Sequence, residues 1–434
     1  MACLVEEVAV YPVRFTSDEK KALLCRFLRY VKINTQSDEN STASPSTECQ
    51  KDLARLLVTE LIELGCKDAR MDEWGYVYGT IAANLEGPSA SRVPAIGLLA
   101  HLDTYFGTKG DNVRPQVIEH YEGGDLRLPG DPTQVLRPET EANLGRCKGH
   151  TIITSDGTTL LGADDKAGIA EIMSVVAYLQ AHPEFKHGRI CIAFTPDEEV
   201  GRGTEHFDRA AFGADFAYTL DGSDLGEVED ETFCADSALV TIEGLDVHPG
   251  YAKGKMVSAV RAASALVSHL PEAHLPETTE GRESYLHPYD IRGDVTKVEV
   301  KFLVRAFEVE GIKARENDLT RLLEWLGRQF SGVKVTVTFK EQYRNMKYKL
   351  DEDPRVVEYA FEAIQRQGLE PARKAIRGGT DGARLSYMGL LTPNIWAGGQ
   401  SFHSVREWVS LEWMAAAAET TVALLGVWVE KALG

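Results

Sequence analysis

Residues 189–201, RICIAFTPDEEVG, combine a continuous apolar run with three consecutive acids, Asp197, Glu198 and Glu199. The apolar run is typical of a strand that is covered on both faces of a parallel sheet. Adjacent carboxylates repel one another, and an ordinary turn needs at most one of them. We therefore expect a buried strand that ends where other parts of the chain compensate this negative charge.

Similar apolar runs recur along the chain, separated by segments of helical length. Strands are predicted at 77–84, 93–100, 189–194, 215–220 and 392–397, and helices within 17–66 and at 166–179 and 353–367. Strands that alternate with helices indicate an α/β fold. We predict a mixed sheet that lies between layers of helices.

Residues 225–343 follow a different order: strand, helix, strand, helix, strand. The second of these helices has an apolar stripe at i, i+3, i+4 and i+7, which suits packing on one face of a sheet. We predict an inserted α+β unit of ferredoxin-like type at 225–343. The larger domain is then made of 1–224 and 344–434, in keeping with two domains for 434 residues.

The composition excludes several classes of partner. With 47 Lys and Arg against 66 Asp and Glu, the net charge of −19 argues against nucleic acid and anionic membranes. No run reaches 18 apolar residues, so no membrane span is expected, and residues 1–10 lack the basic start of a signal peptide. The seven cysteines contain no C-x-x-C motif. A cytoplasmic protein is predicted.

Side chains with the chemistry of metal ligands follow the predicted strands. They are His101 and Asp103 after 93–100, Asp197–Glu199 after 189–194, Asp221 after 215–220, His403 after 392–397, and Asp164 with Asp165 at the start of a helix. Functional groups in open α/β sheets gather beyond the carboxyl ends of the strands. We expect these segments to meet at one edge of the sheet.

Each of these residues also has an ordinary interpretation. Asp164 is suited to cap a helix, His101 to fill a core position, and Asp221-Gly222 to form a turn. Together, however, buried carboxylates without a cation would repel strongly. Imidazole and carboxylate without thiolate suit zinc, cobalt or manganese, and one carboxylate can bridge two such ions. The sequence therefore predicts a binuclear metal site.

The motifs around these residues resemble the peptidase T family of the co-catalytic zinc carboxypeptidase/aminopeptidase clan. In chain order they are AHLDT, TTLLGADDKAGIAEIM, TPDEEVGRG, YTLDG, VHPGYAKGKMV, IRGGTDGARLSYMGL and GGQSFH. The match runs from about residue 20 to 430 and includes PSTE at 45–48 and YRNM at 343–346. The resemblance implies a zinc-peptidase fold with a lid, and a cytosolic di-zinc aminopeptidase that acts on short peptides, most of all tripeptides.

The resemblance also implies metal ligands. His101 and Asp221 would bind one zinc ion, Glu199 and His403 the other, and Asp164 would bridge both. A cis peptide bond would follow the bridging aspartate.

The implied catalytic residues are Glu198 and Asp103. Glu198 would be the general base that takes a proton from the metal-bridging water. Asp103 would orient the imidazole of His101. Asp197, the remaining acid of the opening stretch, has no implied role beyond its turn or a backbone hydrogen bond.

Substrate contacts are implied for His248, Arg305, Asn345 and Arg377. His248 matches a lid histidine that stabilises the oxyanion, in some relatives across a dimer, so a homodimer is one expectation. A histidine in a Pro-Gly turn is the alternative for His248, and structural salt bridges are the alternative for the arginines.

Two other functions stay open. A related di-metal dipeptidase, carboxypeptidase or N-acyl amino acid deacylase would keep the site and change the substrate. A catalytically silent peptide-binding protein would need no Glu198. The chain also departs from the family pattern after His403, where it reads SVREW in place of a glycine and a further histidine.

Overall fold

The computed structural model describes residues 11–87 and 90–434, which form two compact units. The first contains the described residues up to Asp230 together with Tyr348–Lys374 and Thr380–Gly434, and the second contains Glu231–Lys347 and Ala375–Gly379. The sequence predicted an insertion at 225–343. The stretch 1–10, for which no signal peptide was predicted, lies outside the described residues.

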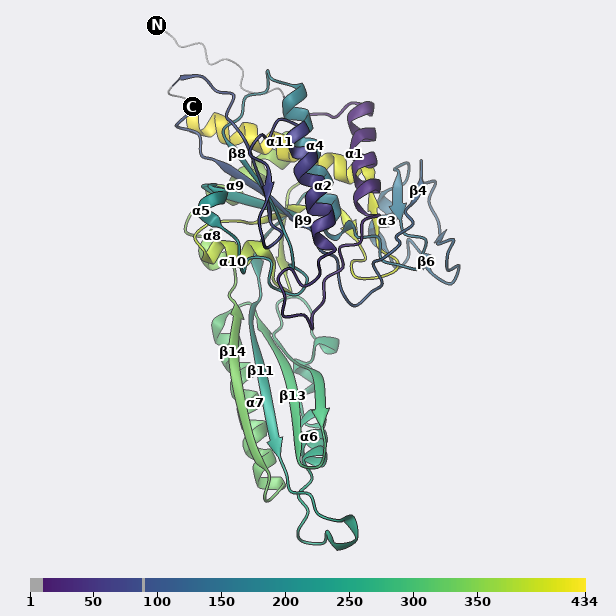
Figure 1. Ribbon diagram of the computed structural model, residues 1–434, viewed down its shortest axis with the longest axis vertical. Coiled ribbons are helices and arrows are strands. Elements are labelled where there is room, and N and C mark those ends of the chain that lie inside the picture. Colours follow the sequence, from purple (N-terminus) through teal and green to yellow (C-terminus); the bar gives the residue numbers. More distant parts are fainter. Residues whose placement is uncertain (1–10, 88–89) are drawn as a thin grey trace. The chain divides into compact units, whose positions relative to one another are not determined.

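The first unit is built on an eight-stranded sheet in the order β1-β2-β8-β3-β9-β16-β10-β15. Figure 1 labels β8 and β9 of this sheet. The strands are β1 (Arg70–Met71), β2 (Val77–Ile81), β3 (Ile96–His101), β8 (Ile190–Thr195), β9 (Phe216–Gly222), β10 (Glu227–Thr232), β15 (Ala372–Ile376) and β16 (Asn394–Trp396). Neighbours among β8, β3, β9 and β16 pair in parallel, whereas β1, β2 and β10 pair antiparallel. The predicted mixed sheet is confirmed.

Helices pack against this sheet. The helix α4 (Ala163–Ala181) packs on β3 and β9 and contacts α1 (Ser17–Tyr30) and α11 (Leu411–Leu433). Phe212 and Leu385 belong to a core cluster that includes Leu99 of β3 and Ala193 of β8. Those two residues come from α5 (Arg209–Phe212) and α10 (Asp381–Tyr387); the remaining helices of the unit are α2 (Gln50–Glu63), α3 (Ala142–Arg146), α8 (Lys347–Leu350) and α9 (Arg355–Arg366).

Two small sheets were not predicted from the sequence. One has the order β17-β18-β7-β4 and the other pairs β5 with β6. Their strands have two or three residues each, which is too short for a recognisable alternation: β4 (Gln116–Ile118), β5 (Leu126–Arg127), β6 (Val135–Leu136), β7 (Ile152–Thr154), β17 (Gly399–Gln400) and β18 (Trp408–Ser410). The larger of them matters for the site, because the loop with His403 joins β17 to β18.

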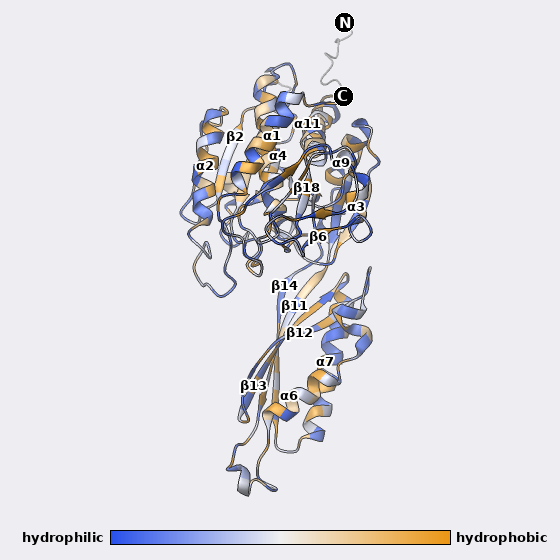
Figure 2. Cartoon of the chain, turned by 90° about the vertical axis from the view of Figure 1, so that its right-hand side faces the viewer, coloured by the Kyte–Doolittle hydropathy of each residue, from blue (hydrophilic) through white to orange (hydrophobic). Residues whose placement is uncertain are grey.

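The second unit has the element order β11-α6-β12-β13-α7-β14 and an antiparallel sheet in the order β12-β13-β11-β14. This is the ferredoxin-like arrangement. Its elements are β11 (Cys234–Glu243), α6 (Ala259–Ser268), β12 (Tyr285–Gly293), β13 (Lys297–Ala306), α7 (Val309–Gln329) and β14 (Lys334–Tyr343), with short 3₁₀ turns η2 (Pro249–Tyr251), η3 (Glu272–His274) and η4 (Pro276–Thr278). Orange and blue residues alternate along α6 and α7 in Figure 2, and the buried ones pack on the sheet.

The strand β12 was missing from the sequence prediction. It contains Pro288, which cannot donate a ladder hydrogen bond, and its pairing with β13 shifts register between Pro288 and Asp290. Such features are tolerated at a sheet edge, where β12 lies. The irregularity hides the alternation from which a strand is recognised.

In the part of the chain that the structure describes, none of the helices combines the length and the hydropathy needed to cross a membrane.

Candidate metal centre

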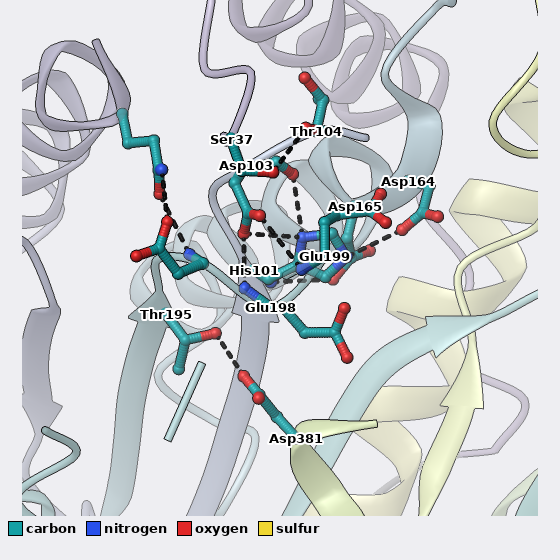
Figure 3. Close-up of polar contacts among 12 residues, drawn as sticks. Ser37, His101, Asp103, Thr104, Asp164, Asp165, Thr195, Glu198, Glu199 and Asp381 are labelled. Carbon is teal, nitrogen blue, oxygen red and sulfur yellow. Dashed lines mark hydrogen bonds and ion pairs between the residues drawn. The ribbon is translucent and has the colours of Figure 1, made fainter. Parts of the chain in front are cut away.

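The site forms where neighbouring strands end. β3 ends at His101, β8 ends two residues before Asp197, and Asp221 is near the end of β9. Because β3 pairs in parallel with both β8 and β9, their carboxyl ends lie side by side. Figure 3 shows Asp103 and Asp164 beside the imidazole of His101.

Two groups of donor atoms are each close enough to surround one ion. The first is His101, Asp164 and Asp221, and the second is Asp164, Glu199 and His403. In the first, His101 Nε2 lies 2.8 Å from Asp164 Oδ1 and 3.7 Å from Asp221 Oδ1. In the second, His403 Nε2 lies 3.1 Å from Asp164 Oδ2 and 3.0 Å from Glu199 Oε2. All five predicted ligand residues are thus brought together.

Asp164 belongs to both groups through different oxygens. Its Oδ1 faces His101 and its Oδ2 faces His403. The residue stands at the start of α4, after Gly162, whose φ of 81° is readily adopted by glycine. The peptide bond between Asp164 and Asp165 is cis, as the resemblance implied.

The imidazole of His403 is held by the segment after β3. The ring of Tyr105 stacks on it with 4.1 Å between centroids and 4° between planes. The Thr108 hydroxyl donates to the His403 carbonyl at 2.6 Å. His403 is the most exposed of the five, with 42% of its side chain accessible.

Asp103 supports the acidic turn after β8 as well as His101. Its Oδ1 accepts the Glu198 amide at 2.9 Å and its Oδ2 accepts the Glu199 amide at 3.1 Å. Nδ1 of His101 lies 2.9 Å from the carbonyl of Asp103 and 3.5 Å from its Oδ1. This buried carboxylate therefore holds the backbone from which the two glutamates project.

The Glu198 and Glu199 side chains differ in their partners. Within residues 11–87 and 90–434, the Glu198 carboxylate makes no hydrogen bond or ion pair. Glu199 meets His403 through Oε2, whereas its Oε1 is buried and has no partner there.

The pKa values of the site residues reflect this crowding of carboxylates. Burial, together with the nearby acids, raises the pKa of Glu198 and of Asp221 well above the ordinary value, and it raises the pKa of Glu199 to about 7. Burial would lower the pKa of His403, but the carboxylates of Asp164 and Glu199 outweigh it and raise that pKa to about 10. The cluster thus strongly favours added positive charge.

Two site residues, Asp381 and Glu407, were not singled out by sequence reasoning, and Asp165 was named there without a role at the metals. Asp381 accepts the Thr195 hydroxyl at 2.7 Å and lines a small cavity with Glu198 and His101. Asp165 accepts the His101 amide at 3.1 Å. Glu407 is fully buried beside the start of α4. Both Asp381 and Asp165 stand inside quoted motifs, TDG and ADDK, which was the available signal.

The four predicted substrate residues all belong to the second unit. His248 is exposed before η2, and its Nδ1 accepts the Gly250 amide at 3.1 Å. Arg305 is buried and donates to the carbonyls of Asp236 and Val304.

Asn345 and Arg377 also have partners inside the second unit. Asn345 is buried, donates to the Phe307 carbonyl and accepts the Thr232 amide. Arg377 donates to the carbonyls of Gly281 and Glu283. These contacts stabilise the unit, and neither they nor the contacts of Arg305 are the salt bridges weighed as the alternative for the arginines.

Comparisons with known proteins bear on this site. A family model described as peptidase family M20/M25/M40 matches residues 154–426. Peptidase T of Geobacillus thermodenitrificans (strain NG80-2) is 47% identical over 412 residues, covering 95% of this chain and 99% of that protein. Peptidase T of Clostridium perfringens (strain 13 / Type A) is 47% identical over 406 residues, covering 94% of this chain and 98% of that protein.

A solved structure shares the fold. A tripeptidase from Staphylococcus aureus matches with a TM-score of 0.74 and 23% identity, covering 95% of this chain and 99% of that chain. The resemblance carried by the motifs is confirmed by the family model and by the full-length relatives. The chain belongs to peptidase family M20/M25/M40 and, within it, groups with the peptidases T.

Proposed function

We propose that this peptidase removes the N-terminal residue from short peptides, most of all tripeptides, with two divalent metal ions. The observation that carries the proposal is that the two carboxylate oxygens of Asp164 face two separate groups of donors. The names of the full-length relatives support the substrate class.

The donors fit divalent ions. Two ligands of one tetrahedral ion, each about 2.0–2.2 Å from it, lie about 3.3 Å apart. The separations around His101, 2.8 and 3.7 Å, lie on either side of that value, and those around His403, 3.0 and 3.1 Å, are slightly smaller. Oε1 of Glu199 is buried and has no hydrogen-bond partner in the described residues, so it is a further oxygen that could bind an ion.

Each residue then has a role at the metals. His101 and Asp221 would hold one ion, Glu199 and His403 the other, and Asp164 both. Nitrogen and oxygen donors without sulfur suit zinc, cobalt and manganese, and we propose zinc.

Glu198 is the residue proposed to transfer the proton from the attacking water. When bound, the two ions would polarise the scissile carbonyl and make water a better nucleophile. The Glu198 carboxylate has no competing partner among the residues that the structure describes, and Asp103 fixes its backbone, so it is placed to accept the proton of the attacking water. The same group would return that proton to the leaving amine.

The test combines chelation with substitution. Wild-type protein should cleave free tripeptides, lose that activity with a chelator and regain it with zinc. Glu198→Gln should lower kcat by about 10²–10⁴-fold with two metals still bound. The control is Glu205→Gln, an exposed glutamate of the same loop, which should behave as wild type.

Each unfavourable outcome has a defined meaning. Near-normal kcat in Glu198→Gln removes the base assignment. Cleavage of N-acyl amino acids without cleavage of free tripeptides favours the deacylase alternative. Metal binding with no hydrolysis of any peptide favours the silent binding protein.

The second unit is proposed to contribute substrate contacts as a lid. Of its four candidates we favour His248, because it is exposed whereas Arg305 and Asn345 are buried among partners of their own. His248→Ala should lower kcat without a change in the thermal unfolding midpoint. Sedimentation tests the proposed homodimer, and mixing His248→Ala with Glu198→Gln should restore activity if the histidine acts across it.

A cytoplasmic location also stays part of the proposal. All six cysteines in the described part of the chain are free, as expected in a reducing compartment.

A further inference from the structure

Glu407 connects the two segments that carry His403 and Asp164. It stands four residues after His403, immediately before β18, and 1% of it is exposed. Its Oε2 accepts the amides of Leu161 and Gly162, each at 2.8 Å, and its Oε1 accepts the amide of Asp164 at 3.0 Å. One carboxylate therefore binds three amides of a single turn.

Within the described part of the chain, the turn itself supplies no acceptor for these three amides. The first amides of a helix lack intrahelical acceptors, and the residue before α4, Gly162, has no side chain to cap them. Asp164 and Asp165 also depart from helical backbone angles. A carboxyl group has enough acceptor sites for three amides, and the amides at this end of a helix need acceptors from outside it. Glu407 supplies from a distant segment what a capping residue would supply locally.

The segment of Glu407 is itself anchored. The amide of Glu407 donates to the Ser404 carbonyl at 3.2 Å, and the Ser155 hydroxyl donates to the Val405 carbonyl at 3.2 Å. The next residues form β18, which pairs with β7 ahead of the Asp164 turn. Glu407 thus ties the His403 loop and the Asp164 turn together at one point.

We propose that Glu407 is a positioning residue that holds Asp164 with one carboxylate oxygen toward each group of metal donors. This inference rests on the proposed two-metal function. Without the three hydrogen bonds, the backbone of Asp164 is free to turn, and its two oxygens no longer face His101 and His403 together. The free energy of binding both ions then includes the cost of ordering that turn.

The experiment measures metal binding rather than activity. Apo-protein of wild type and of Glu407→Gln is titrated with zinc in competition with a chromophoric chelator. Glutamine has the same shape, but its amide nitrogen must face backbone amides where an oxygen was, so some of the hydrogen bonds are lost. Residues that orient ligands without touching the metal typically contribute 10–100-fold in affinity, and we expect a loss of that size.

Glu419→Gln is the matched control. Glu419 is buried in α11 and also accepts a backbone amide, that of Phe15 at 2.7 Å, but it is not part of the metal centre. This variant should bind zinc as wild type does. If Glu407→Gln does not give folded apo-protein by circular dichroism, Glu407→Asp replaces it, because the shorter carboxylate cannot reach all three amides and should also weaken zinc binding.

The outcomes separate this inference from the function on which it rests. Two zinc ions in wild type, with weaker binding in Glu407→Gln alone, support it. Wild-type zinc affinity in folded Glu407→Gln or Glu407→Asp overturns it and leaves the two-metal function intact. Wild type that binds fewer than two ions overturns the proposed function instead.

Discussion

Asp197 is the acid of the opening stretch with no proposed role in metal binding or catalysis, and its replacement by alanine should destabilise the fold. Its carboxylate is buried and accepts the amide and the hydroxyl of Ser46 and the side-chain amide of Gln50. Arg202 lies 3.4 Å from it. These contacts join the end of β8 to the PSTE segment and to α2.

The magnitude follows from the donors that would lose their acceptor. A buried donor left unsatisfied costs about 1–3 kcal/mol, and two are affected, the amide and the hydroxyl of Ser46, because Gln50 Nε2 also donates to the hydroxyl oxygens of Ser46 and Thr47. Asp197 also has a φ of 60°, which aspartate and asparagine tolerate and alanine does not, adding about 1 kcal/mol. We expect Asp197→Ala to lower the free energy of unfolding by roughly 3–7 kcal/mol if water does not fill the gap. Asp197→Asn, which keeps one acceptor and the backbone preference, should lose roughly 1–3 kcal/mol.

The assay is urea unfolding followed by circular dichroism, with the metal concentration held constant because bound ions also stabilise the native state. Asp208→Ala is the control: Asp208 is exposed and caps α5 through one hydrogen bond, so about 1 kcal/mol is expected. A change in Asp197→Ala no larger than in Asp208→Ala would refute the reasoning.

Three further outcomes are expected. Glu171 is buried with neither carboxylate oxygen partnered in the described residues, and burial raises its pKa well above the ordinary value. The native state therefore binds a proton that the unfolded chain releases above about pH 4.3, and its stability falls as pH rises from there. Glu171→Met should raise the urea midpoint more at pH 8 than at pH 5; an equal gain at both would contradict this. A Cβ at Gly168 would lie 1.9 Å from the Leu220 carbonyl, so Gly168→Ala should displace α4 and reduce the bound metal, whereas Gly327→Ala, with open space around it, should be tolerated or stabilising. His403→Ala should lower the metal content from two ions to one by elemental analysis, and an unchanged content would remove it from the ligands.

Much of the first unit could be predicted because the sequence patterns that mark its strands and ligands are local. Apolar runs mark β3, β8, β9 and β16, and ligand-type residues stand next to their ends, where parallel strands bring them together. By contrast, β12 escaped prediction because Pro288 and a register shift break its alternation. Strands of two or three residues, as in the two small sheets, are too short to show an alternation of apolar and polar residues.

Chain order and residue type predicted that His101, Asp221, His403, the pair Asp164 and Asp165, and Asp197–Glu199 meet at one edge of a sheet. The family resemblance selected the five ligands among them. Which oxygen of Asp164 faces which histidine, and which of the adjacent glutamates stays unpaired, was decided by tertiary structure. The groups that hold the backbone of these residues, Asp103 for the two glutamates and Glu407 for Asp164, are about 95 and 243 residues away along the chain. A hydrogen bond depends on separation in space, and that separation leaves no trace in sequence spacing. The three acids of TPDEEVG are neighbours in the chain, yet the fold treats them differently: Asp197 binds Ser46 and Gln50, Glu199 meets His403, and the Glu198 carboxylate makes no hydrogen bond to the described residues.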